Sequence, residues 1–174
     1  GQEISFQIAF RLSPVIKFTT KNLNVCVSSP IGSVNLFEVG EVPVTLAAYP
    51  ERNDKDYISL DSGIFPDVLS PLSNGEIVVA TPVLWKSLWV SIKLPEDCPH
   101  GIHTVKVSFY NNEEIISEDI SIKIKVHKIA LPEQKLIFTQ WFHCDCIADV
   151  HRVKIFSEKH WNLIGSYMKL AAEH

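Results

Sequence analysis

Residues 136–149 read LIFTQWFHCDCIAD, and the pattern of the chain changes at this stretch. Before it, short segments alternate apolar and polar residues, which is typical of strands with one buried face. Residues 136–142 are almost continuously apolar, which predicts a strand covered on both faces, as in a parallel sheet. We therefore predict a β-rich domain over residues 1–130 and a different architecture over residues 131–174.

Several segments before residue 128 show the period of two expected of strands. The clearest places Leu88, Val90 and Ile92 on one face and Trp89 on the other. Other predicted strands lie at residues 4–10, 23–27, 42–48, 77–80, 105–109 and 120–126, and Pro43 indicates an edge or a strand start. Turn residues separate these segments and no helical period appears among them, so we predict an antiparallel β-sandwich.

Residues 50–74 lack a regular pattern. Residues 51–57 (ERNDKDY) are charged and predict a surface loop, whereas residues 63–72 (GIFPDVLSPL) combine two prolines with apolar side chains. A long segment with apolar anchors of its own is usually packed or functional, so we expect an ordered excursion here. Asp67 is expected to organise that loop through local hydrogen bonds.

The last part of the chain predicts a strand, a loop and a helix. Ser157 is placed to cap the helix, and Glu158 follows near its positive end. Trp161, Ile164 and Met168 recur at helical spacing. One such βα unit cannot bury both faces of its strand by itself, so we expect the natural protein to continue beyond His174 as an α/β domain.

Composition excludes some classes of function. The net charge is −4 and no basic patch is present, so nucleic acid is not an expected partner. No apolar run approaches the ~20 residues that a membrane-spanning helix needs, and no secretory signal is visible. The four cysteines do not suggest a disulfide scaffold, so we expect reduced thiols and a cytoplasmic location. An extracytoplasmic location stays open, because the chain starts at Gly1 and not at Met.

Three stretches resemble the glycoside hydrolases of family 123 and their bacterial relatives. They are GIFPDVLSPL (63–72), SLWVSIKLPEDCPHGIHTVKV (87–107) and LPEQKLIFTQWFHCDCIADVHRVKIFSEKHW (131–161). The resemblance implies a β-sandwich followed by a (β/α)8 (TIM) catalytic barrel, of which residues 131–174 would be the first strand and helix. It also implies a carbohydrate substrate, β-linked N-acetylgalactosamine, and no cofactor.

In this family the resemblance implies substrate-assisted hydrolysis, an exception to the scheme with two enzymic carboxylates. The acetamido oxygen of the substrate attacks the anomeric carbon, while an adjacent Asp and Glu orient the amide and donate the proton. That acid pair is expected beyond His174, so the 174-residue chain is expected to be inactive. Glu113 with Glu114, and Glu118 with Asp119, are adjacent acids too, but their place on a sandwich hairpin favours a solvated face.

Trp141, His143 and Asp145 are the candidate substrate-binding residues. They lie at the carboxyl end of the predicted first barrel strand, the edge where barrel enzymes keep their chemistry. On an extended strand His143 and Asp145 point the same way and could bind sugar hydroxyls beside the Trp141 ring. Alternatively, the two polar residues stabilise the loop and Trp141 fills the barrel. Residues 143–146 (HCDC) are all possible zinc ligands, but nearly consecutive residues cannot readily surround one ion, so no metal is expected.

The predicted sandwich contains two tryptophans and two histidines that could have a role in binding. Trp85 and Trp89 could form a platform on which a sugar stacks, although packing in the core or between domains is the simpler interpretation. His100 and His103 are expected to be turn and strand residues. The alternative function for the whole chain is a stand-alone module that binds a carbohydrate or a protein, and fold alone does not decide between the two.

Overall fold

The structure is a computed structural model of the chain. The described residues are 2–13, 19–45, 60–111, 114–115, 119–129, 132, 135–137, 139 and 141–173. The chain divides into two compact units, Gly1–Ala130 and Leu131–His174.

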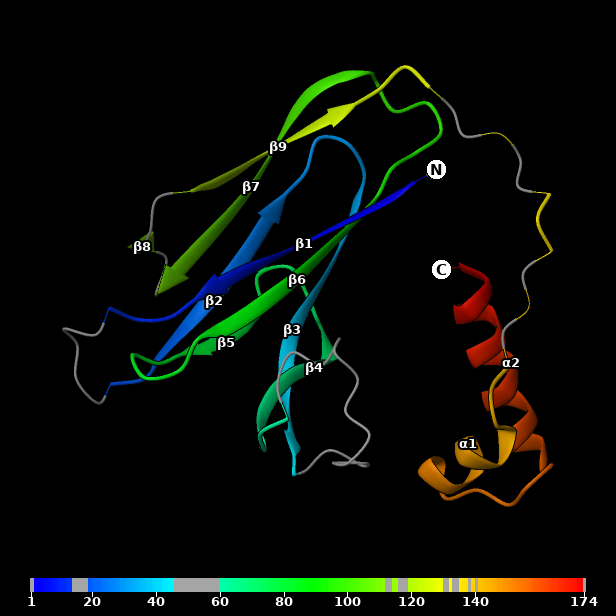
Figure 1. Ribbon diagram of the computed structural model, residues 1–174. Helices are drawn as coiled ribbons and strands as arrows, with labels where there is room; N and C mark the ends of the chain where they lie inside the picture. Colours follow the sequence, from blue (N-terminus) through cyan, green and yellow to red (C-terminus); the bar gives the residue numbers. More distant parts are fainter. Residues whose placement is uncertain are drawn as a thin grey trace. The chain divides into compact units, whose positions relative to one another are not determined.

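The first unit is built from antiparallel strands in two sheets (Figure 1). The strands are β1 (Glu3–Phe10), β2 (Lys21–Ser28), β3 (Ser33–Val44), β4 (Gly63–Leu72), β5 (Ile77–Ala80), β6 (Lys86–Lys93), β7 (Gly101–Asn111), β8 (Glu114–Ile115) and β9 (Ile120–Val126). The first sheet has the order β1-β6-β3-β4, and the second the order β5-β2-β7-β8 with β9 also paired to β7. The predicted fold class is confirmed: the chain is mainly β, a sandwich followed by a short helical part.

Alternation along the strands places the apolar side chains between the two sheets. On β6, Leu88, Val90 and Ile92 are fully buried, whereas Trp89 on the opposite face is half-buried. Removing each such aliphatic side chain from water stabilises the fold by about 1.5–3 kcal/mol relative to leaving it exposed. The alternation read from the sequence therefore identifies the buried face of this strand correctly.

Both sheets contribute to one core. The buried residues of the core include Ile8, Phe10, Leu36, Leu88, Val90 and Ile92 from the first sheet, and Leu23, Val25, Val27, Val78, Val105, Val107, Phe109 and Ile124 from the second. The rings of Phe10 and Phe109 lie 5.2 Å apart between centroids, within the range of favourable aromatic pairs. This contact joins β1 of one sheet to β7 of the other.

The pairing of β3 with β4 corrects two predictions. β3 begins at Ser33, well before the predicted strand at residues 42–48, and residues 63–72 form strand β4 instead of a loop excursion. β4 lies at the edge of its sheet, where prolines such as Pro66 and Pro71 are tolerated, and most of its side chains are exposed. Because side chains on both faces of β4 are exposed, its sequence lacks the alternation of apolar and polar residues that marks a half-buried strand. Residues 46–59, including the loop predicted at 51–57, lie outside the described residues.

The second unit contains two helices, α1 (Cys144–His151) and α2 (Glu158–Glu173). The predicted start of α2 is confirmed, because the Ser157 hydroxyl accepts a 3.3 Å hydrogen bond from the backbone N–H of His160. Helix α1 was not predicted. Neither described helix has the length and apolar character needed to cross a bilayer.

The strand predicted at residues 136–142 is wrong for the described part of that stretch. Residues 135–137, 139 and 141–143 belong to neither a strand nor a helix. A strand covered on both faces obtains its backbone hydrogen bonds from flanking strands. In this unit the described residues supply only helices, so an apolar composition is not enough to form a strand here.

Candidate functional site

The candidate residues His143 and Asp145 lie at the start of α1. His143 is the N-cap residue, with φ −87° and ψ 109°, and its side chain makes no capping hydrogen bond. Asp145 belongs to the first turn of the helix, where the positive end of the helix dipole favours a carboxylate. The two residues are therefore not on one extended strand, so the expectation that strand geometry points their side chains the same way is wrong.

The structure nevertheless brings the two side chains together. The Nδ1 atom of His143 lies 4.0 Å from Oδ1 of Asp145. This separation permits an ion pair when the imidazole is protonated, but it is too long for a hydrogen bond. The side chains are 88% and 70% exposed, so both can still bind another molecule.

Trp141 precedes this pair and is also exposed. Its relative exposure is 96%, so the described residues leave almost the whole indole accessible. A tryptophan ring offers a flat apolar face on which a sugar can stack. The three candidate residues thus present an aromatic ring, an imidazole and a carboxylate within five positions of the chain, and their contact with sugar stays a prediction.

A residue that the sequence analysis missed holds this segment in place. His160 on α2 is completely buried, and its Nε2 atom donates a 2.7 Å hydrogen bond to the carbonyl oxygen of Cys144, between His143 and Asp145. Its Nδ1 atom accepts a 2.8 Å hydrogen bond from the backbone N–H of Phe156. One side chain therefore connects α2, the loop before it and the first turn of α1. No sequence signal identifies this role, because it depends on how the two helices pack.

The two sandwich tryptophans have different surroundings. Trp85 is 57% exposed, and the guanidinium carbon of Arg11 lies 4.5 Å from its ring centroid, a cation–π geometry. Trp89 is half-buried on the outer face of β6, between its cross-strand neighbours Gln7 on β1 and Phe37 on β3. Packing on the sheet therefore accounts for Trp89 better than a free stacking platform does.

Three other residues that the sequence analysis singled out make local contacts or lie on strands. His103 Nε2 lies 2.7 Å from the carbonyl oxygen of Pro99, which fits its predicted place at a turn and strand. Asp67 lies exposed on β4, so the loop that it was expected to organise is a strand. Asp119 is exposed, as its expected place on a solvated face requires, and it also accepts a 2.6 Å hydrogen bond from the Ser108 hydroxyl. Glu113 and Glu118 lie outside the described residues.

Metal ligands do not gather in the described part of the chain. No group of three or more His, Cys, Asp or Glu side chains that could hold a metal ion occurs among the residues that the structure describes. Cys26, Cys98, Cys144 and Cys146 are all free thiols.

The fold and the exposed residues at α1 define the class of protein: a two-sheet β-sandwich followed by a helical segment with a candidate ligand-binding group. Residues 141–174 match the family model of the glycoside hydrolase 123 catalytic domain. This match contains Trp141, His143 and Asp145, and it confirms the resemblance to family 123 in this part of the chain. None of the curated proteins matches the sequence.

A solved structure shows the same fold. It is a family 123 glycoside hydrolase from Clostridium perfringens, studied for the details of glycolipid glycan hydrolysis. The similarity covers 93% of this chain with a TM-score of 0.70 and 18% sequence identity. This chain spans 28% of the length of that enzyme.

Proposed function

We propose that this chain is the N-terminal part of a glycoside hydrolase that acts on β-linked N-acetylhexosamine, and specifically on N-acetylgalactosamine. The observation that carries the proposal is the match of residues 141–174 to a catalytic-domain model of family 123. In this proposal the protein is bacterial, residues 131–174 are the first part of a TIM barrel, and the sandwich is a non-catalytic domain that precedes the barrel in the sequence.

The chemistry proposed is substrate-assisted. The acetamido oxygen of the sugar attacks the anomeric carbon, so the enzyme supplies an acid pair that orients the amide and protonates the leaving oxygen. We place that pair beyond His174. The role left to this chain is binding, with Asp145 accepting from sugar hydroxyls, His143 donating or accepting according to its protonation, and Trp141 stacking on the ring.

The experiment is hydrolysis of an aryl N-acetyl-β-galactosaminide by the full-length gene product, run beside the 174-residue chain. Release of the aryl alcohol by the long protein and none by the short one is the expected result. An inactive but folded long protein would overturn the proposal and would favour the binding-module alternative.

The role of the candidate residues is tested in the long protein. Asp145→Asn is expected to lower kcat/KM by about tenfold, the size of one lost hydrogen bond to a charged group. Asp149→Asn is the matched control, because Asp149 is exposed on the same helix and makes the same change of charge. Equal effects of the two substitutions would remove Asp145 from the site.

The sandwich has a supporting role in this proposal. We expect that deletion of residues 1–130 from the long protein gives an insoluble or inactive enzyme, because in this proposal the barrel depends on the sandwich for its stability. Soluble expression and aryl-glycoside hydrolysis measure this directly. A soluble deletion variant with an unchanged rate would contradict the supporting role.

A further inference from the structure

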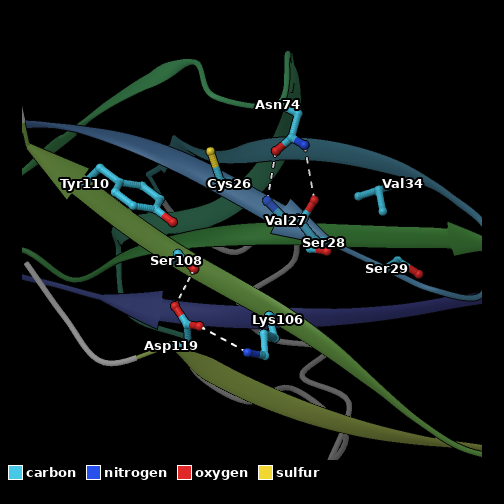
Figure 2. A pocket seen from close by; sticks show the side chains of 10 residues that line it. All are labelled: Cys26, Val27, Ser28, Ser29, Val34, Asn74, Lys106, Ser108, Tyr110 and Asp119. Carbon is cyan, nitrogen blue, oxygen red and sulfur yellow. Dashed lines mark hydrogen bonds and ion pairs between the residues drawn. The ribbon is translucent and has the colours of Figure 1, made fainter. Parts of the chain in front are cut away.

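A polar depression of about 640 Å³ lies on the sandwich (Figure 2). Its walls come from segments far apart in the sequence: β2 and Ser29 after it, the start of β3, the β4–β5 turn, β7, and the residue before β9. The lining residues are Cys26, Val27, Ser28, Ser29, Val34, Asn74, Lys106, Ser108, Tyr110 and Asp119. This volume lies within the range of sites that bind small molecules.

Asn74 fixes one wall of the depression. Its side-chain oxygen accepts a 2.8 Å hydrogen bond from the backbone N–H of Val27, and its amide nitrogen donates a 3.1 Å bond to the carbonyl oxygen of the same residue. β5 pairs with β2 only as far as Asn24, so Asn74 replaces a strand neighbour for Val27. The wall is therefore held by the sheet and does not depend on a ligand.

A row of three polar side chains forms the opposite wall. The Ser108 hydroxyl donates a 2.6 Å hydrogen bond to Oδ1 of Asp119, and the Lys106 ammonium lies 3.5 Å from Oδ2 (Figure 2). Ser108 is 7% exposed, so this hydroxyl is a built element of the wall. The hydrogen bond from Ser108, assisted by the nearby positive charge of Lys106, lowers the pKa of Asp119, and the carboxylate persists at neutral pH.

The charges of the lining cancel. Lys106 carries one positive charge and Asp119 one negative charge, and the lining contains no other Lys, Arg, Asp or Glu. An anion or a cation would meet a charge of its own sign beside the attractive one. A neutral ligand with several hydroxyl groups avoids that conflict, because adjacent hydroxyls can donate to the carboxylate and accept from the ammonium together.

Tyr110 supplies the apolar contact. Its side chain is half-buried on β7, in the same depression as Ser108 and Asp119. A tyrosine ring packs against the C–H face of a sugar while its hydroxyl stays available for hydrogen bonding. The Ser28 hydroxyl, exposed at the end of β2, adds a further donor and acceptor.

We propose that this depression is an accessory saccharide-binding site on the sandwich, in which Lys106 and Asp119 hold neighbouring hydroxyls and Tyr110 contacts the ring. The choice of a sugar as the neutral polyol rests on the proposed function. All residues of this site belong to the first unit, whereas Trp141, His143 and Asp145 belong to the second.

The experiment is an NMR titration of the 174-residue chain, labelled with ¹⁵N, with methyl N-acetyl-β-D-galactosaminide. The probe is added up to roughly 50 mM, because a single sugar is expected to bind with a Kd in the millimolar range. Saturable shifts are expected at the backbone amides of residues 26–28, 106–110 and 119. Absence of saturable shifts at these amides would overturn the proposal.

Two variants and a titration with sodium sulfate test whether binding at the depression is specific for the sugar. Asp119→Asn is expected to raise the Kd by about tenfold, because it removes a charged acceptor. Asp97→Asn makes the same change in an exposed turn away from the depression and is expected to leave the Kd within about twofold, inside the scatter of surface substitutions. Equal Kd values for the two variants would overturn the proposed saccharide site. Saturable shifts at the same amides with sodium sulfate, and none with the sugar, would overturn it too.

The titration and the hydrolysis assay distinguish failure of the accessory site from failure of the proposed function. Sugar binding at the depression without hydrolysis by the long protein supports the site and overturns the enzyme. Hydrolysis by the long protein without shifts at the depression supports the enzyme and overturns the site.

Discussion

His160 is the buried polar residue that connects the two helices of the second unit. Its ring nitrogens bond to the Cys144 carbonyl and the Phe156 N–H, and Phe156 has a φ of +57°, an unusual conformation for a residue other than glycine. Replacing His160 with alanine leaves both backbone groups without this partner. Each buried group that stays unsatisfied lowers the free energy of unfolding by about 1–3 kcal/mol. We expect His160→Ala to unfold or loosen this unit, measured by amide hydrogen exchange of α2.

His151→Ala is the matched control for that substitution. His151 is an exposed histidine of α1 whose Nε2 lies 3.1 Å from the Tyr167 hydroxyl, so its loss exposes no buried group. We expect an effect below about 1 kcal/mol. Equal loss of protection in both variants would contradict the role given to His160.

The largest single cause of the lowered pKa of Asp119 is the hydrogen bond from the Ser108 hydroxyl, and Lys106 lowers the pKa further by its charge and by a hydrogen bond of its own. We expect Ser108→Ala to raise the pKa of Asp119 toward its ordinary value of 3.8, and Lys106→Met to raise it as well. Carboxyl ¹³C chemical shifts followed against pH measure both changes. A larger rise in Lys106→Met would show that charge, and not the hydroxyl, is the main cause.

The same interaction determines the direction of a pH effect. The pKa of Asp119 is lower in the folded protein than in the unfolded chain, so the carboxylate favours folding. Its contribution to stability is therefore present above about pH 3.8 and is lost as the pH falls through the lower folded pKa.

At the scale of elements, the start of β3 depends on Gly32. A Cβ atom added there would meet the backbone carbonyl oxygen of Lys93, at the end of the neighbouring strand β6. Backbone cannot move aside as a flexible side chain does, so we expect Gly32→Ala to destabilise the sandwich by about 1–3 kcal/mol. Urea unfolding followed by tryptophan fluorescence measures the change as a lower midpoint.

Gly165→Ala provides the opposite expectation in the same chain. Nothing lies within 4 Å of a Cβ added at Gly165 on α2, so alanine gains helix propensity without a clash. We expect it to stabilise α2 by up to about 1 kcal/mol. If both substitutions changed stability in the same direction, close approach at Gly32 would not be the cause.

At the scale of the whole molecule, the two units differ in how much apolar surface they bury. The sandwich has a core shared by two sheets, whereas the buried residues of the helical unit are Ile147, Ala148, His160 and Ile164 among those described. We expect amides of β2, β6 and β7 to exchange more slowly than those of α2 by about two orders of magnitude or more. Hydrogen exchange read by mass spectrometry tests this, and equal protection of the two units would contradict it.

The sequence by itself determined the sandwich and the second helix. Alternation identified the buried face of β6, because burial on one side of a strand needs an apolar residue at every second position. Ser157 marked the start of α2, because a hydroxyl at that position satisfies a free N–H of the first turn. These signals are local, so one segment of sequence is enough to show them.

Only the tertiary structure decided the rest. β4 has no alternation because side chains on both of its faces are exposed, and its pairing with β3 depends on a partner distant in the chain. The apolar stretch before His143 resembled a buried strand, but a strand forms only where neighbours supply its hydrogen bonds. The bonds of His160 and the gathering of Lys106, Ser108, Tyr110 and Asp119 in one depression are contacts between elements, and no local pattern in the sequence encodes them.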